Sequence, residues 1–355
     1  MKKNIYVLCG GKSVEHEVSL KSSSAIINSI DRKKYNVYPI YITYDGVWCN
    51  LGLWEDKIEN PEELKKPCEG TIYRSIGNFL TEELKENSIV FPALHGPNGE
   101  DGTIQGMLEI LNIPYVGNEV LSSALAMDKS ITKDILAKHN IPQVKHLSFT
   151  QYEWELNRED ILKKTDTNLY YPMYIKPARG GSSVGISRAE NIDDLEKAIV
   201  EAFLYDRKIV IEEEALAREM QISVVGNDNP KASLPGEFIM DRPFFDYNAK
   251  YIDNKVIPVI PAKLTDEVTE LVREIAVKTF KVLDCNGLVR VDIFVTDENE
   301  IFVNEINTMP GFTPLSMTPV LWGATDGTTY SGLVEILIEL GFDRYRQKSK
   351  IINRR

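Results

Sequence analysis

The chain has 355 residues, 43% of them hydrophobic and 26% charged, which is typical of a globular protein with two or three domains. Its formal net charge of −12 argues against nucleic-acid binding, because that needs a basic surface facing the phosphates. No apolar run approaches the ~20 residues of a membrane span, and the apolar run at the N-terminus is too short for a signal peptide. A cytoplasmic protein is therefore expected.

The first 120 residues alternate between apolar runs and amphipathic segments. This alternation predicts a parallel sheet covered by helices, that is, a Rossmann-like N-terminal domain over residues 1–120. The strands are expected at 5–9, 36–43, 88–94 and 114–117, and the helices at 18–30 and 103–111.

After residue 120 the pattern becomes mixed, and the fold class predicted for the whole chain is α/β (α+β). A central segment, 121–215, has a helical pair at 122–127 and 129–140, strands at 171–177 and 208–214, and a helix at 192–206. The last segment, 216–355, has strands at 219–227 and 233–239 and a long helix from 266. A hairpin follows, formed by 287–295 and 300–307.

The four cysteines are scattered and lack the spacing of a metal site. In a cytosolic protein, thiols are expected rather than disulfides. All four are therefore predicted to be free, at Cys9, Cys49, Cys68 and Cys285.

The predicted hairpin carries polar side chains on one face. Side chains two apart on a strand point the same way, so Arg290 and Asp292 share a face, as do Glu305 and Asn307. Pairing of the two strands would bring Asp292 near Glu305 and Asn307. Two carboxylates and an amide supply the oxygen ligands that Mg²⁺ prefers. The alternative is a solvated strand face.

A glycine-rich segment, KPARGGSSVG at residues 176–185, follows the predicted strand YPMYI. Glycine lets backbone N–H groups approach phosphate oxygens, and Lys176 would add positive charge there; a flexible surface hairpin is the alternative. The other glycine turn, CGGKSVEHEVSL at residues 9–20, is not a P-loop, because Tyr6 stands where that motif needs glycine.

Two candidate binding residues follow strands of the first domain. Glu15 lies at a helix N-terminus, where it could pair with a substrate ammonium or complement the helix dipole. His95 lies where ligands bind in open α/β sheets, or it stabilises its turn. The aromatic segment FFDYNAKYID, 244–253, is expected to form a lid or a contact between domains.

Taken in order, seven segments resemble the D-alanine–D-alanine ligases, a family with the three-domain ATP-grasp fold. They extend from residue 9 to about residue 317 and are CGGKSVEHEVSL, LHGPNGEDGTIQG, MDKSITK, IKPARGGSSVG, FDYNAKY, GLVRVDIFV and NEINTMPGFTPLSM. The resemblance implies ATP-dependent joining of two D-alanines through a D-alanyl phosphate, for peptidoglycan precursor synthesis. It also implies two Mg²⁺ ions, which Mn²⁺ could replace, and a cytoplasmic homodimer without nucleic-acid or membrane partners.

The resemblance also implies a role for each matching residue. The phosphates and nucleoside of ATP would contact the loop at 179–185 and the residues Lys129, Lys176, Ser183, Glu212, Glu213, Ala215 and Glu219. The metal ligands would be Asp292, Glu305 and Asn307. Catalysis would use a hydrogen-bonded set of Glu15, Ser182 and Tyr251, with Arg290 and the backbone of Gly311 holding the oxyanion. The amino-acid substrates would contact Glu15, His95, Ser316 and Met317, and Lys250 would reach the phosphate being transferred.

Three alternatives stay open. The second substrate could be D-serine, because D-serine-adding relatives keep a similar Lys-Tyr loop, whereas those that add D-lactate lack the pair Lys250-Tyr251. A different ATP-grasp ligase would share the phosphate and metal residues but not the turn SVEHEVSL. A catalytically silent nucleotide-binding protein would require the loss of a ligand, and none of these residues is missing.

Overall fold

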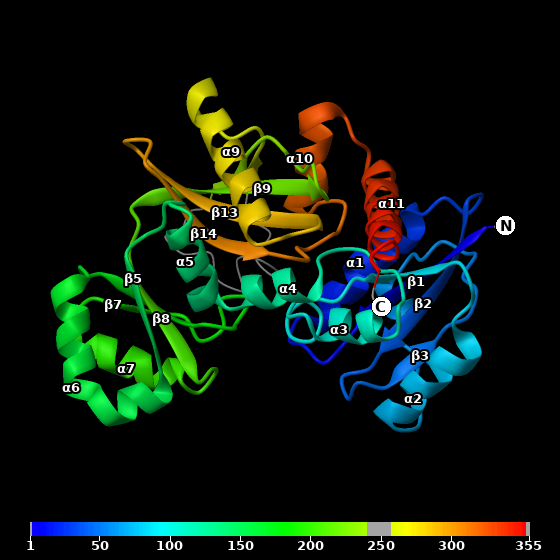
Figure 1. Cartoon of the computed structure of the whole chain (residues 1–355), viewed down its shortest axis with the longest axis horizontal. Coiled ribbons are helices and arrows are strands. Elements are labelled where there is room, and N and C mark those ends of the chain that lie inside the picture. The colour runs from blue at the N-terminus through cyan, green and yellow to red at the C-terminus, as the bar shows by residue number, and fades with distance from the viewer. Residues whose placement is uncertain (1, 240–256, 353–355) are drawn as a thin grey trace.

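The computed structural model describes residues 2–239 and 257–352, which build three sheets with helices packed on them (Figure 1). The first sheet lies at the right of the view, the second at the lower left and the third at the top. Each sheet is made from one continuous stretch of the chain, in the order in which the stretches occur. The molecule is therefore mixed α/β, as predicted.

The first sheet has the order β3-β2-β1-β4. Strand β1 (Lys3–Gly10) pairs in parallel with β2 (Tyr35–Ile42) and β4 (Ser88–Pro92), which confirms the predicted parallel sheet, while β3 (Trp48–Asn50) is an antiparallel edge strand. The strand predicted at 114–117 is reduced to a single bridge between Tyr115 and Val90. The helices of this stretch are α1 (His16–Ser29), α2 (Ile72–Asn78) and α3 (Thr103–Ile110), with short turns η1 (Pro61–Leu64) and η2 (Phe79–Glu83).

The second sheet is antiparallel, in the order β5-β8-β6-β7. Its strands are β5 (His146–Thr150), β6 (Met173–Pro177), β7 (Ser187–Ala189) and β8 (Lys208–Glu213). Helices α6 (Gln151–Asn168) and α7 (Ile192–Ala202) cover it and share a buried apolar cluster with it. Helix α6 was not foreseen, because its sequence has little apolar periodicity and buries only Trp154 and Thr165.

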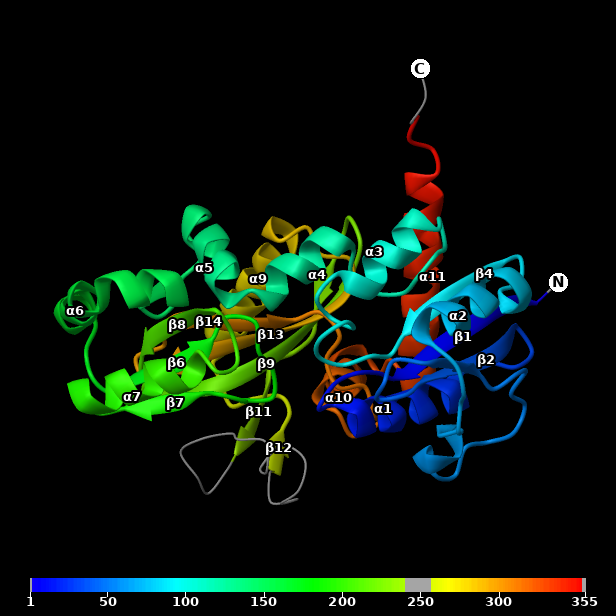
Figure 2. The same ribbon diagram turned by 90° about the horizontal axis from the view of Figure 1, so that it is seen from below.

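The third sheet is also antiparallel, with β9 (Ala217–Gly226) and β13 (Gly287–Thr296) at its centre. Beside them lie β14 (Ile301–Asn307), β11 (Gly236–Ile239), β12 (Ile257–Val259) and the short β10 (Lys231–Ala232). Helices α4 (Val120–Met127), α5 (Lys129–Lys138) and α9 (Asp266–Val282) lie on one side of this sheet (Figure 2). Helix α10 (Met317–Asp326) contacts β9.

The C-terminal helix α11 (Tyr330–Lys348) returns to the first sheet. Leu333, Leu337 and Phe342 belong to the same buried cluster as Ile5 and Ile89. Gly341 allows the close approach, because a Cβ atom there would lie 2.7 Å from the Tyr115 carbonyl oxygen. The two ends of the described chain therefore share one core.

One prediction about the cysteines is wrong. Cys49 on β3 and Cys68 form a disulfide, with their Cα atoms 6.2 Å apart, while Cys9 and Cys285 are free and buried. The partners are 19 residues apart in the sequence, so only the fold brings them together. Among the described residues, no helix is long and apolar enough to cross a bilayer.

Thiol titration tests this pairing. Under non-reducing denaturing conditions we expect about two reactive thiols per chain, from Cys9 and Cys285, and about four after reduction. In the folded protein the reaction should be slow, because burial raises the pKa of both free thiols and keeps them protonated. Four thiols without reduction would contradict the disulfide.

Candidate active site

The hairpin of β13 and β14 gathers acidic and amide side chains on one face. Asp292 pairs with Glu305 and Arg290 pairs with Asn307, and the Asn307 amide donates to Asp292 Oδ2 at 3.1 Å. This confirms the arrangement predicted from alternation. Two carboxylates and one amide oxygen suit Mg²⁺, which takes its remaining ligands from water and substrate phosphates.

Each of these carboxylates has a cation of the protein beside it. Arg290 donates to both oxygens of Asp292, at 2.7 Å each, and Lys129 Nζ lies 3.6 Å from Glu305 Oε2. Burial acts to lower the pKa of Arg290, but Asp292 and Glu305 raise it overall. Over residues 2–239 and 257–352, no group of three or more His, Cys, Asp or Glu side chains is placed to hold a metal. A cation here would therefore depend on phosphate oxygens as well.

A buried carboxylate between two lysines faces this hairpin from the second sheet. Glu212 on β8 lies 2.7 Å from Lys176 Nζ of β6 and 3.0 Å from Lys133 Nζ of α5. Burial alone would raise the pKa of Glu212, but the two lysines hold it far below its usual range. Burial lowers the pKa of Lys133, whereas Glu212 outweighs burial and raises that of Lys176. Lys176 also reaches Asn304 of β14 at 3.5 Å, so it connects the two sheets.

The predicted phosphate loop follows β6. Ser182 and Ser183 have φ of 52° and 59°, so two consecutive residues without a glycine's freedom adopt positive φ in this turn, and the Val184 N–H donates to the Gly181 carbonyl at 3.1 Å. The Lys129 ammonium donates to the Gly180 carbonyl at 2.7 Å. Lys129 thereby joins this loop to the carboxylate of Glu305.

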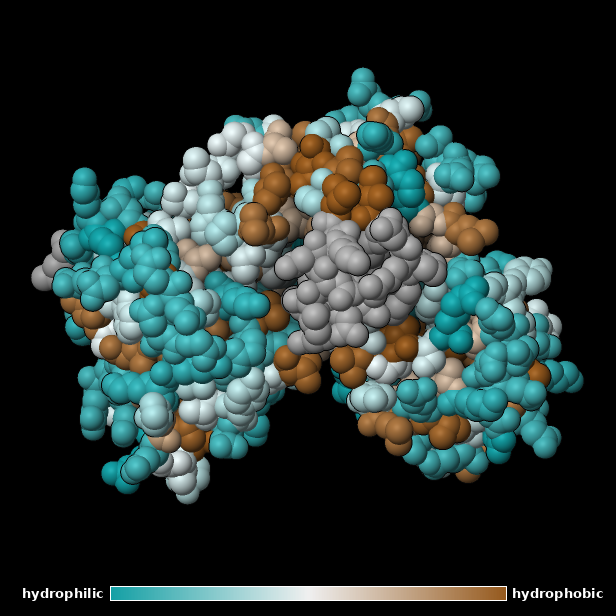
Figure 3. Space-filling view, turned by 180° about the vertical axis from the view of Figure 1, so that it is seen from behind, coloured by the Kyte–Doolittle hydropathy of each residue, from teal (hydrophilic) through white to brown (hydrophobic). Residues whose placement is uncertain are grey.

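Glu15 connects the phosphate loop to the first sheet. It precedes α1 and accepts a hydrogen bond from Ser182 Oγ at 2.7 Å, so this pair of the predicted catalytic set is brought together. Gly96 has a φ of +74°, which favours glycine, and a Cβ atom there would lie 2.6 Å from Glu15 Oε2 and displace the carboxylate. The first two sheets lie in separate lobes with a notch between them (Figure 3), and the contact of Glu15 with Ser182 bridges those lobes.

His95 is buried and uses both ring nitrogens within the protein. Nε2 lies 2.9 Å from Ser22 Oγ, and Nδ1 lies 2.9 Å from the Met309 carbonyl oxygen. Ser22 Oγ also accepts from the backbone N–H of Phe312 at 3.2 Å, so the two side chains bracket the turn that contains Gly311. Burial acts to lower the pKa of His95, but the Glu100 carboxylate beside it raises it overall.

The other predicted residues lie on or next to β8, β9 and α10. Glu219 of β9 accepts from the Asn304 amide at 3.2 Å, while Glu213 and Ala215 lie at and just after the end of β8. Ser316 is the N-cap residue of α10, where its hydroxyl accepts from the Thr313 N–H at 2.9 Å, and Met317 is buried directly after it. Lys250 and Tyr251 lie outside the described residues.

Four side chains of the site were missed: Lys133, Asn304, Glu100 and Ser22. Lys133 and Glu100 stood inside two of the quoted segments, MDKSITK and LHGPNGEDGTIQG. Asn304 stood inside a third segment, NEINTMPGFTPLSM, but alternation places it on the face opposite to Glu305, and the register shift between Asp292 and Ile293 could not be seen in the sequence. Ser22 gave no signal, since only folding brings it to His95.

Models of one protein family match both parts of the chain. The model described as D-ala D-ala ligase N-terminus matches residues 4–118, and the model described as D-ala D-ala ligase C-terminus matches residues 135–339. The chain belongs to the D-alanine–D-alanine ligase family.

Individual members of the family resemble the whole chain. The D-alanine–D-alanine ligase of Listeria welshimeri is 45% identical over 365 residues, covering 99% of this chain and 98% of that protein. Among solved structures, the VanG D-Ala:D-Ser ligase of Enterococcus faecalis superposes with a TM-score of 0.82 at 33% identity, over 96% of this chain and 100% of the other. The Bacillus anthracis ligase, solved in complex with ATP, has a TM-score of 0.75 at 28% identity, over 98% and 99%. The family fold is ATP-grasp, as predicted.

Replacing Glu212 tests the buried charge cluster. Glu212→Gln leaves Lys133 and Lys176 without their shared counterion, so we expect the free energy of unfolding at pH 7 to fall by about 3 kcal/mol. The pKa of Glu212 is lower in the folded protein than in the unfolded chain, where it is about 4.3. The ionised carboxylate therefore contributes its full stabilisation above pH ~4.3, and this contribution is lost as the pH falls through the pKa of the folded protein. The difference between the two proteins should therefore persist at pH 5 and shrink only in stronger acid.

Urea unfolding at several pH values measures this difference. Glu213→Gln on the same strand is the matched control, since Glu213 is more exposed and lies 3.7 Å from Lys145, and it should cost less than about 1 kcal/mol. Equal effects of the two substitutions would show that the Glu212 cluster contributes no special stability.

Proposed function

We propose that this protein joins two D-alanine molecules in an ATP-dependent reaction that releases ADP and phosphate. The observation that carries the proposal is the arrangement of charged side chains on the second and third sheets. The hairpin face with Asp292, Glu305 and Asn307 lies near the lysines that contact Glu212. The hydrogen bond between Glu15 and Ser182 brings the first sheet to the same region. The family relationship supports the same reaction, and the dipeptide would supply peptidoglycan synthesis.

In the first step, the carboxylate of one D-alanine attacks the γ-phosphate of ATP, ADP leaves, and an acyl phosphate forms. Lys129 and Lys176 offset the negative charge of the phosphates, while backbone N–H groups around Ser182 and Ser183 cradle them. Mg²⁺ held by Asp292, Glu305 and Asn307 would neutralise and orient the phosphate oxygens. The phosphate is needed because a free carboxylate has no oxygen that can leave.

In the second step, the amine of the other D-alanine attacks the acyl carbon, and phosphate leaves with the bonding electrons. Arg290 and the backbone N–H of Gly311 stabilise the oxyanion of the tetrahedral intermediate. The contacts of His95 with Met309 and of Ser22 with Phe312 hold this turn in place. Water has to be kept out, since an acyl phosphate hydrolyses readily.

The two D-alanines and the nucleotide are assigned to separate groups of residues, with the two amino acids side by side so that the amine of one can reach the acyl carbon of the other. Glu15 binds the ammonium of the first D-alanine, and His95, whose pKa is raised by Glu100, lies near its carboxylate. Ser316, beside Met317, binds the carboxylate of the second. On the nucleotide, Glu212 and backbone groups near Glu213 and Ala215 bind adenine, and Glu219 binds the ribose. Roles for Lys250 and Tyr251, the homodimer and the cytoplasmic location stay predictions from the resemblance.

A D-alanine–D-serine ligase is the second candidate. It is favoured by one observation, the superposition on the VanG D-Ala:D-Ser ligase with a TM-score of 0.82. Both candidates share every step up to the acyl phosphate and differ only in the amine that attacks it.

Phosphate release with Mg²⁺ and ATP separates these candidates. We expect release with D-alanine alone, a product with the mass of D-alanyl-D-alanine, and complete loss after chelation of the metal. A mixed product formed in preference when D-serine is added would move the protein to the second candidate. Failure of D-alanine to stimulate release under any condition would contradict both.

A further inference from the structure

A buried lysine outside the set just described contacts the site through Glu212. Lys133 lies on α5 with 1% of its surface exposed, and its ammonium is 3.0 Å from Glu212 Oε1. Among the described residues, Glu212 is the only acidic side chain within ion-pair distance of it. A buried ammonium is costly unless a partner compensates it, so this lysine depends on Glu212.

The two lysines hold Glu212 from different elements. Lys176 reaches Oε2 from β6, the neighbour of β8 in the second sheet, and Lys133 reaches Oε1 from α5, which packs with the third sheet. Each oxygen thus has its own cation, a hydrogen bond from Lys176 on Oε2 and an ion pair with Lys133 on Oε1, and attraction at both oxygens disfavours rotation of the carboxylate plane. With Lys133 removed, the carboxylate could turn about its contact with Lys176.

We propose that Lys133 is a positioning residue that orients the Glu212 carboxylate toward the adenine amino group of ATP. The inference rests on the proposed function, which places adenine at Glu212. A carboxylate oxygen can only accept, so it favours a base with an amino group at position 6 over one with a carbonyl there. Correct orientation of Glu212 therefore selects ATP over its inosine analogue, ITP.

Lys133→Met removes the charge and keeps most of the side-chain volume. We expect the KM for ATP to rise about tenfold, while kcat and the KM for D-alanine change less than about twofold. The preference for ATP over ITP in kcat/KM should fall by a similar factor. Added to Glu212→Gln, the substitution should have almost no further effect on that preference, because both act through one carboxylate.

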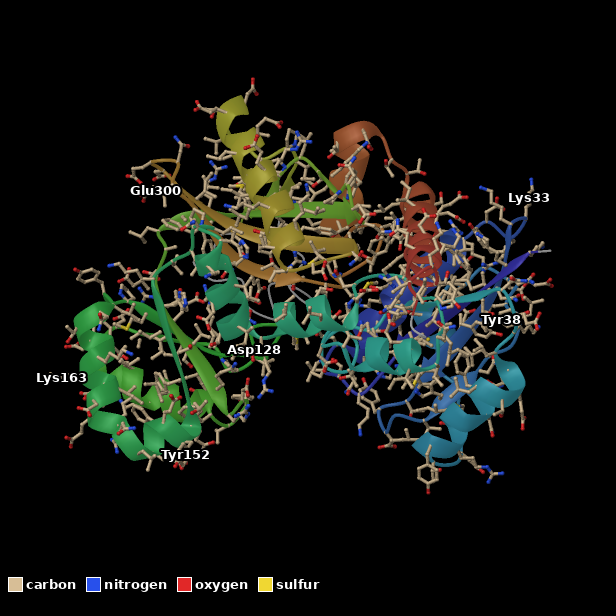
Figure 4. The ribbon with its side chains drawn as sticks, viewed as in Figure 1. Lys33, Tyr38, Asp128, Tyr152, Lys163 and Glu300 are labelled. Carbon is tan, nitrogen blue, oxygen red and sulfur yellow. A yellow bond between two sulfur atoms is a disulfide. The ribbon has the colours of Figure 1, made fainter. Side chains whose placement is uncertain are left out.

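A neighbouring ion pair provides the control. Lys208, also on β8, contacts Asp128 at the N-terminus of α5 at 2.6 Å, and Figure 4 shows Asp128 at the junction of α4 and α5. Lys208→Met removes a contact between α5 and β8 without touching Glu212. It should leave the KM for ATP and the ATP/ITP preference unchanged if orientation of Glu212, rather than docking of α5, is what matters.

The outcomes separate the inference from the proposed function. If the wild type releases no phosphate in response to D-alanine, the proposed function is wrong, and the inference that rests on it falls as well. If the wild type is active but Lys133→Met leaves the ATP/ITP preference unchanged, the inference is wrong and the proposed function stands. The same conclusion follows if the effects of Lys133→Met and Glu212→Gln on that preference are fully additive. Should circular dichroism show Lys133→Met unfolded, Lys133→Gln tests the same preference with a neutral polar side chain.

Discussion

The register between β13 and β14 determines the positions of the charged side chains on the hairpin face of the site. It sets Asp292 against Glu305 on one face, while the alternate residues Val291 and Ile293 enter the core. Because side chains alternate along a strand, a slip by one residue would turn the carboxylates into the apolar core and the apolar residues toward the charged face. The register that packs the core therefore also places the side chains of the site. The pairing of β13 with β9 fixes the position of β13 from its other edge.

Gathering acids on one face is costly unless cations offset them. Here Arg290 and Lys129 lie beside the two acids of the hairpin, and Lys133 and Lys176 share Glu212. Without substrate, these cations are paired with carboxylates of the chain. Phosphate and metal binding would then exchange one set of ion pairs for another, which costs less than creating buried charge anew.

The hairpin face could be predicted because strand alternation is a local property, visible in residues 287–307 alone. The phosphate loop was also visible, since glycines and serines directly follow an apolar strand. Contacts between distant segments could not be predicted from pattern. Examples are His95 with Met309, Lys133 with Glu212 and Cys49 with Cys68, each of which depends on how separate elements pack. Packing of α11 on the first sheet is of the same kind, because an apolar helix face does not identify its partner.

The central claim is that the β13–β14 face binds metal together with nucleotide, and electron paramagnetic resonance of Mn²⁺ tests it most directly. Mn²⁺ would be titrated into the wild type and into Glu305→Gln with a non-hydrolysable ATP analogue present. The account predicts two protein-bound ions per chain in the wild type and loss of at least one of them in the variant. Equal binding to both proteins would contradict it.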